Sequence, residues 1–199
     1  MKIDLRHNFA DVQKALSRLP DELRDDAMRI GMNKTIDKGR AEMVRGITSE
    51  FNVKASTVRP RLSVKGATKK GGRYFLQAEL FVSSGKRSQN LIRFVEGSTT
   101  MAEARRRAKA GTLPEVFFKV KKGSAKKFIK GAFIGNNGRT MFVREGDGRL
   151  PLKALSVIDT PQMFNTKRIN RRVIERMERE AGIEVERAAK VVLARFNAR

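Results

Sequence analysis

A chain of 199 residues with 44 Lys and Arg, 21 Asp and Glu and no cysteine has a net charge of +23 and is long enough to bury its own core. This composition excludes disulfide frameworks and zinc–thiolate sites, and the charge favours polyanionic partners. Because it has no run of about 18 apolar residues and no signal-peptide core near Met1, we expect a soluble protein, made in the cytoplasm, that does not contact membranes.

The first block, residues 1–51, is nearly neutral and predicts helices. Asn8 and Asp11 resemble a capping signal for a first helix, and Pro20 fits the first turn of a second helix that continues to about Phe51. A stripe of three glycines on the second helix is eight and seven residues apart: Gly31, Gly39 and Gly46. Such a stripe indicates either a neighbouring element packed closely against it or a helix that tolerates the glycines and bends there.

The middle block, residues 52–159, predicts short strands and loops. Its alternating segment 73–82 predicts one strand with Tyr74, Leu76, Ala78, Leu80 and Val82 on one face. Further extended segments are expected at 90–95, 115–120, 127–134, 140–144 and 150–158. Turns are expected at Asn136-Asn137-Gly138, where a hairpin needs positive φ, and at 145–148. Residues 60–72 and 97–111 are expected to be exposed loops.

The last block, residues 160–199, predicts one amphipathic helix of about 30 residues and about 45 Å, capped by Asn165 or Thr166. Its apolar residues recur at nearly every fourth position. This length exceeds what a compact domain of this size needs, so we expect part of the stripe to contact another subunit. The expected subunit-contact residues are Ile169, Val173, Met177, Val185, Val192 and Phe196.

These blocks together predict an α+β fold for a single domain over residues 1–199. A small antiparallel β core, either a sheet or a sandwich, is expected between long N-terminal and C-terminal helices.

The residue types that carry catalysis or bind metals form no catalytic pattern. His7 is the single histidine and has no evident partner to orient it. Glu145 and Asp147 fit a turn better than a cation site. There is no phosphate-binding glycine loop, and the acidic residues of the middle block are too scattered for a nuclease. We therefore predict no catalytic residues, no cofactor and no metal, and a protein that is not an enzyme.

The informative feature is the basic charge of residues 51–159, which hold 24 Lys and Arg against 7 Asp and Glu. A charge run is commonly a solvated face, but this excess favours contact with a polyanion. The 12 Phe fall mostly in apolar strand patterns and are expected in the core, so we predict sequence-independent phosphate contacts that weaken with salt. The predicted nucleic-acid-facing residues are Arg105, Arg106, Arg107, Lys109, Lys121, Lys122, Lys126 and Lys127.

Several segments, taken in order, resemble a known family. They are the helix start at 27–34, the basic segment 53–62, the strand Gly131–Ile134, the turn and strand 137–145, and the Leu-Pro-Leu segment within 149–164 that leads into the final helix. In this order they are similar to the bacteriophage minor tail protein Z family, the tail-completion proteins of long-tailed phages.

This resemblance implies a structural protein of the virion, located at the head-proximal end of the tail near the neck, after assembly in the host cytoplasm. It implies a role in tail finishing, head–tail joining and DNA passage. The implied partners are copies of the same chain in a hexameric ring, the tail terminator, the head–tail connector, and DNA bound non-specifically in the lumen. A sequence-independent DNA-binding protein that acts free in solution stays open as the alternative.

Overall fold

The computed structural model describes residues 2–5, 20–82, 89–95, 106, 110, 116–146 and 148–198. The chain divides into two compact units. Unit 1 comprises residues 1–46, 58–84 and 164–199, and unit 2 comprises residues 47–57 and 85–163. Long helices occur near both ends of the chain and the strands form small antiparallel sheets, which confirms the α+β class. The strands of the predicted middle block are shared between the two units.

Two long helices dominate unit 1. Helix α2 (Asp21–Glu50) begins directly after Pro20 and has two acidic residues in its first turn, as predicted from the dipole preference. Helix α6 (Lys167–Asn197) begins after Thr166, whose side chain makes no capping hydrogen bond. The first helix expected after Asn8 lies outside the described residues.

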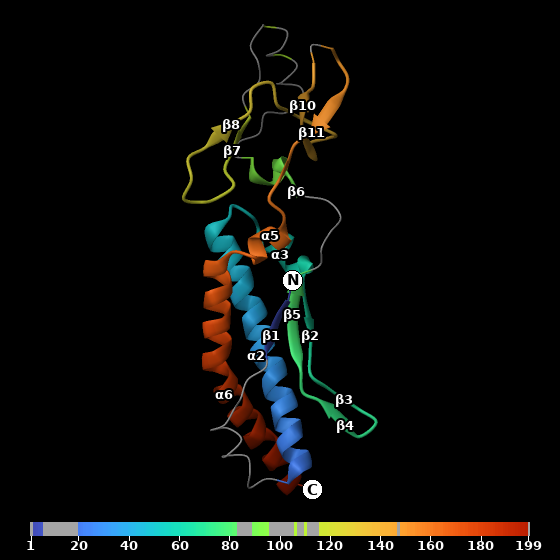
Figure 1. Ribbon diagram of the computed structural model, residues 1–199, viewed down its shortest axis with the longest axis vertical. Coiled ribbons are helices and arrows are strands. Elements are labelled where there is room, and N and C mark those ends of the chain that lie inside the picture. The colour runs from blue at the N-terminus through green and yellow to red at the C-terminus, as the bar shows by residue number, and fades with distance from the viewer. Residues whose placement is uncertain are drawn as a thin grey trace. The chain divides into compact units, whose positions relative to one another are not determined.

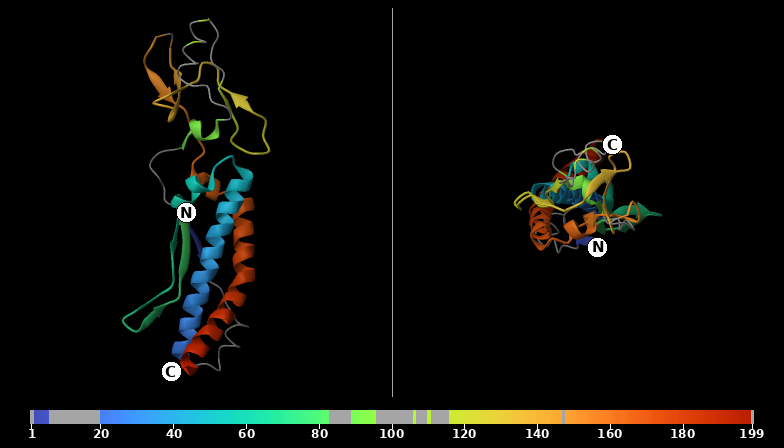
Figure 2. Two further views of the ribbon diagram at one scale, coloured as in Figure 1. Left: turned by 180° about the vertical axis from the view of Figure 1, so that it is seen from behind. Right: turned by 90° about the horizontal axis from the view of Figure 1, so that it is seen from above.

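Helix α2 lies alongside α6 (Figures 1 and 2), and its glycine stripe is the surface that meets α6. A Cβ atom at Gly31 would lie 2.5 Å from Val185 Cγ2, and one at Gly39 would lie 2.5 Å from Met177 Sδ. A Cβ at Gly46 would lie 2.7 Å from Ile169 Cγ2. The partners run backwards along α6, so the helices are antiparallel, and close packing explains the three glycines.

On the side of α2 away from α6, unit 1 carries a three-stranded sheet (Figure 1). Its strands are β1 (Lys2–Leu5), β5 (Ala78–Val82) and β2 (Leu62–Lys65), in the order β1-β5-β2. Ala78, Leu80 and Val82 alternate as buried residues along β5. The interpretation of residues 1–51 as purely helical was wrong for β1, because strand formation there depends on pairing with β5, far away in sequence.

A hairpin of β3 (Thr68–Lys70) and β4 (Arg73–Phe75) follows β2, with a turn at Gly71 and Gly72, whose φ angles are +54° and +76°. Residues 60–72 were therefore wrongly expected to be a loop, and the strand expected over 73–82 is two strands. The break between β4 and β5 lies across the hairpin from Ala67, which is linked to α2. The Asn33 side chain donates a hydrogen bond to Ala67 O at 3.0 Å and accepts one from Ala67 N at 2.7 Å. Leu76, at the break, is exposed rather than packed with β5.

Unit 2 is built from short elements. Three small sheets have the strand orders β11-β10-β9, β12-β6 and β7-β8. The bounds are β6 Gln89–Asn90, η2 Leu91–Phe94, β7 Phe117–Phe118, β8 Lys127–Phe128, β9 Phe133–Gly135, β10 Thr140–Arg144, β11 Leu152–Ala154 and β12 Ser156–Val157. Three further short helices are α3 Ala55–Val58 and α5 Thr160–Phe164, at unit boundaries, and η1 Arg59–Arg61 of unit 1. The 3-10 helix η2 contacts both β7 and β10.

The predicted hairpin between β9 and β10 is confirmed: Asn136 and Asn137 have φ of 52° and Gly138 has φ of 80°. Two other strand predictions were partly wrong. The segment 127–134 is broken by a turn at Gly131, and most of 90–95 is η2 rather than strand. Residues 91–94 form a 3-10 helix instead of a strand because the Asn90 side chain accepts a hydrogen bond from Ile92 N and so caps η2.

Candidate functional site

The two units differ in charge balance. Among the described residues, unit 2 has 13 Lys and Arg against 3 Asp and Glu, whereas unit 1 has 22 against 13. Three acidic residues cannot neutralise thirteen basic ones by local ion pairs. The net excess is similar in the two units, +10 in unit 2 and +9 in unit 1, but unit 2 has far fewer acidic residues to pair with its basic ones, so its positive charge is the more available to an external anion.

In unit 1, several charges of α2 and α6 form ion pairs. Lys38 Nζ lies 2.5 Å from Glu180 Oε2 and 2.6 Å from Glu184 Oε1. Arg176 pairs with Glu180 at 2.7 Å, and Arg187 with Glu184 at 2.6 Å. Hydrogen bonds to the two carboxylates raise the pKa of Lys38, and the bond from Lys38 is the main reason that the pKa values of Glu180 and Glu184 lie below the ordinary value. These groups join the helices.

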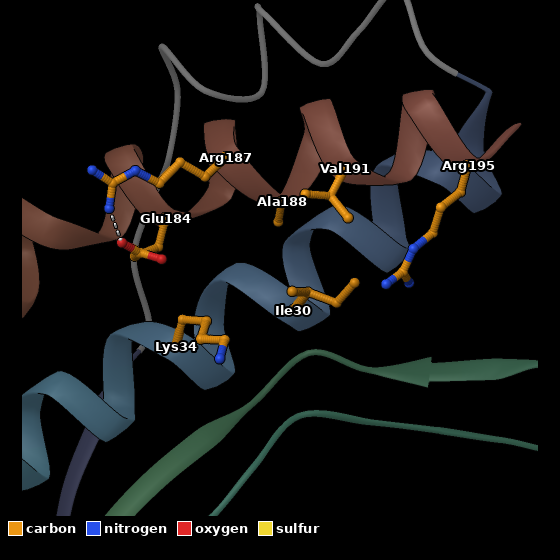
Figure 3. A pocket seen from close by; sticks show the side chains of 7 residues that line it. All are labelled: Ile30, Lys34, Glu184, Arg187, Ala188, Val191 and Arg195. Carbon is orange, nitrogen blue, oxygen red and sulfur yellow. Dashed lines mark hydrogen bonds and ion pairs between the residues drawn. The ribbon is translucent and has the colours of Figure 1, made fainter. Parts of the chain in front are cut away.

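A pocket of about 250 Å³ lies next to this network, between α2 and α6 (Figure 3). Ile30, Ala188 and Val191 supply its apolar lining. The remaining lining residues are charged: Lys34, Glu184, Arg187 and Arg195. Glu184 is held by two cations, which keeps its carboxylate ionised and unavailable as a proton donor. The pocket offers no nucleophile paired with a base, so its geometry supports no catalytic step.

In unit 2, the basic segment between β7 and β8 is anchored through its backbone. Asn52 N donates to Val120 O at 2.8 Å, Lys122 N donates to Glu50 O at 2.9 Å, and Lys119 N donates to Phe94 O at 2.9 Å. Phe51 and Lys121 form an isolated β-bridge, and Lys121 Nζ lies 6.0 Å from the centroid of the Phe51 ring. These bonds give the lysine-rich segment a defined place on unit 2.

The structure brings together four of the predicted nucleic-acid-facing residues. Lys121, Lys122, Lys126 and Lys127 are all exposed on β8 or the segment before it. Of the other predicted cluster, Arg106 is described and exposed, whereas Arg105, Arg107 and Lys109 lie outside the described residues. We name the surface formed by β7, residues 119–126 and β8 the basic hairpin.

Most of the predicted subunit-contact residues are buried inside the chain. Ile169, Val173, Met177, Val185 and Val192 are buried within the chain, on the face of α6 that carries the contacts with the α2 glycines. In this structure they serve intramolecular packing, because the glycines of α2 leave room for the apolar face of α6. Phe196 is the member of the set that is exposed, at 56%.

Three phenylalanines were missed as surface residues: Phe75, which is 55% exposed, and the pair Phe117 and Phe128. Phe117 is 40% exposed and Phe128 is 51% exposed, and they face each other across β7 and β8 with ring centroids 5.8 Å apart. The sequence pattern predicts most of the phenylalanines in the core. The sequence does contain a signal that one of these rings is exposed, since Phe117 and Phe118 are adjacent and a strand turns adjacent side chains to opposite faces. Phe118 takes the buried face.

Within the described ranges, no group of three or more His, Cys, Asp and Glu residues is placed to hold a metal ion. A separate search of those same residues finds no helix with the length and apolar character needed to cross a membrane.

Comparison with known proteins gives one result. The model of the prophage minor tail protein Z family matches residues 11–199, nearly the whole chain. Neither curated proteins nor solved structures give a match. The match confirms the resemblance that several short segments, taken in chain order, indicated in the sequence. It covers nearly all of both compact units, including the described helices and the basic hairpin, and strand β1 lies outside it. The chain belongs to the prophage minor tail protein Z family and is a structural minor tail protein of a bacteriophage virion.

Proposed function

We propose that this protein completes the tail at its head-proximal end, where it serves head–tail joining and DNA passage without catalysing a reaction. The family match supports a structural place in the tail. The observation that carries the finer assignment is the charge of unit 2, with 13 basic against 3 acidic described residues. A polyanion is the partner that such a surface favours.

The proposed DNA contact is made with phosphates and does not read sequence. Sequence readout commonly uses a helix whose side chains reach base edges in the major groove. In this chain the long helices α2 and α6 pack against each other, and the lysines of the basic hairpin lie on strands and turns. Lysine is a point charge that suits phosphate attraction, so binding is expected to weaken as salt rises.

The proposed assembly is a homo-oligomeric ring, with six copies as the natural number for a tail ring, placed between the tail terminator and the head–tail connector. Copies that each carry +23 repel one another unless an anion lies among them. Facing the basic hairpins toward DNA in the lumen relieves this repulsion. It also leaves the outer face of α6, which is not engaged with α2, for contacts with neighbours.

Reconstruction of the virion neck tests this proposal. The expected result is a ring of this chain at the head-proximal end, with residues 121–127 lining the DNA path. Finding residues 121–127 on the outer surface would overturn the lumen assignment, and finding the chain elsewhere in the tail would overturn the completion role. A phage that lacks the gene is expected to make tails that fail to form infectious particles.

A second candidate function is sequence-independent DNA binding by the free protein, which the same excess charge supports. The two candidates differ in where the protein is found. A tail-completion protein co-purifies with tails, whereas a free DNA-binding protein is recovered with DNA and not with tails. Fractionation of infected-cell lysates, with and without nuclease, separates them.

A further inference from the structure

The two faces of the β7–β8 hairpin have opposite character. Phe117 pairs with Phe128 across the ladder on one face, and Phe118 pairs with Lys127. Phe118 is buried and forms a bridge with Val95. Phe117 and Phe128 are 40% and 51% exposed. One face therefore attaches the hairpin to unit 2, and the other presents two aromatic rings to solvent.

This ring pair differs from a second cross-strand pair in unit 2. Phe133 and Phe142 on β9 and β10 are half-buried, and the Arg144 guanidinium lies 5.2 Å from the centroid of the Phe133 ring. That pair contributes to packing in its own sheet. The Phe117 and Phe128 rings are more exposed, and their planes are inclined by 57°. Exposed aromatic surface of this kind commonly marks a binding site.

The charge around the rings selects the kind of partner. Exposed Lys121, Lys122, Lys126 and Lys130 lie in or beside the same hairpin, whereas Lys127 pairs with Phe118 on its other face. A second copy of this surface would bring like charges together and is disfavoured. A polyanion that also offers flat apolar faces satisfies both the lysines and the rings.

We propose that the basic hairpin binds single-stranded DNA, with bases stacked on Phe117 and Phe128 and phosphates held by the neighbouring lysines. In a duplex the bases are paired and stacked on one another, whereas a single strand can turn its bases onto two inclined rings. Aromatic stacking beside a basic track is a general mode of sequence-independent single-strand binding. The inference extends the proposed DNA contact from phosphates to bases, and it rests on that contact only for the role of the lysines.

Fluorescence anisotropy with labelled oligo(dT), and with a duplex of the same length, tests the inference on the full chain. The double variant Phe117→Ala/Phe128→Ala is expected to lose about tenfold or more in affinity for oligo(dT), because each stacked ring contributes substantially, while duplex affinity changes little. Phe196→Ala is the matched control, since Phe196 is 56% exposed but lies at the end of α6. It is expected to leave both affinities unchanged.

A second set of variants separates stacking from general hydrophobic contact. Phe117→Leu/Phe128→Leu keeps apolar side chains without rings and is expected to bind oligo(dT) as weakly as the alanine variant. The chain has no tryptophan, so Phe128→Trp introduces a single reporter. Its fluorescence is expected to be quenched on addition of oligo(dT), as stacked bases contact the indole. Circular dichroism confirms that each variant is folded.

The possible results distinguish this inference from the proposed function. Duplex binding with no dependence of oligo(dT) affinity on the two rings overturns the stacking inference and leaves the phosphate contact standing. Failure of the wild-type chain to bind either DNA form overturns the DNA contact itself. Ring-dependent binding to anionic lipid vesicles without ring-dependent binding to oligo(dT) overturns the inference in favour of a membrane surface.

Discussion

The two units of this chain place charged and apolar groups in opposite ways. In unit 1, Lys38 of α2 bonds Glu180 and Glu184 of α6, and the apolar face of α6 meets the glycines of α2. In unit 2, the basic hairpin leaves lysines and two phenylalanines at the surface. Unit 1 pairs many of its charges internally, whereas unit 2 has few acidic residues to pair with its lysines.

This contrast gives the net charge of +23 a more specific meaning. Charge that is paired across a helix interface contributes to the fold, and charge that has few acidic neighbours contributes to recognition. The comparison can be tested by altering each unit separately. The expected effects below run from the largest to the smallest.

The largest effect is expected from removing the lysines of the basic hairpin. The variant Lys121→Ala/Lys122→Ala/Lys126→Ala/Lys127→Ala should bind duplex DNA roughly a hundredfold more weakly at low salt. The slope of log affinity against log salt should fall by about 0.9 for each phosphate that a lysine no longer neutralises. Titration of labelled duplex at several salt concentrations measures both quantities.

A control with the same change in net charge tests whether location matters. Arg171, Arg172, Arg179 and Arg195 are exposed on α6, and replacing all four with alanine should weaken binding by at most a few-fold. Equal losses in the two variants would show that net charge alone drives binding, and the comparison between units would fail for DNA.

The next effect is expected in the helix interface. A Cβ at Gly31 would lie 2.6 Å from Val185 Cα and 2.8 Å from Val185 N, so Gly31→Ala forces the two backbones apart. We expect a loss of about 2 kcal/mol in the free energy of unfolding, net of the gain in helix propensity, which lowers Tm by roughly 4–8 °C. Thermal unfolding followed by circular dichroism measures it.

The reverse substitution on the same helix calibrates that result. Ala41 is exposed, so Ala41→Gly should cost about 1 kcal/mol through helix propensity alone. If Gly31→Ala stabilised the protein by a similar amount, propensity would govern both sites and the close contact with Val185 would be disproved.

The Lys38 network predicts a pH dependence of smaller size. Glu180 and Glu184 have pKa values lowered from 4.5, so their stabilising effect is present above the unfolded pKa and is lost as the pH falls through the folded pKa. The pKa of Lys38 is raised from 10.5, so its effect is present at neutral pH and is lost only as the pH rises through that higher value.

Lys38→Met should therefore lower Tm at neutral pH, and its Tm should converge on that of the wild type in acid, below the lowered carboxylate pKa values. Tm measured across the pH range checks this. Lys34→Met removes an exposed lysine one turn away and should keep the acid profile of the wild type. A constant difference between Lys38→Met and wild type at every pH would contradict the ionic explanation.

The smallest effect is expected at the middle glycine. A Cβ at Gly39 meets Met177 Sδ and Cγ, which belong to a flexible side chain that can move aside. Gly39→Ala should stay within about 1 kcal/mol of wild type, because the gain in helix propensity offsets the repacking. A loss as large as that of Gly31→Ala would show that the interface is rigid along its whole length.

Local pattern was sufficient for the features that depend on neighbours in sequence. The spacing of apolar residues predicted α6, Pro20 with its acidic neighbours predicted the start of α2, and Asn136-Asn137-Gly138 predicted the turn between β9 and β10. The charge count placed the basic excess in the middle block. The short segments, taken in chain order, also identified the family, because a sequence resemblance can be recognised without knowing which residues are in contact.

Tertiary structure decided what depends on partners distant in sequence. Strand β1 exists through pairing with β5, and the path of the chain at Ala67 is fixed because Asn33 of α2 binds its backbone. The apolar stripe of α6, which includes Ile169 and Val185, was predicted from the sequence, but its burial within the chain depends on the glycines of α2. Likewise, alternation shows that adjacent Phe117 and Phe118 point to opposite faces, whereas only the tertiary structure, in which Phe118 bridges Val95, decides which ring is buried and which is exposed.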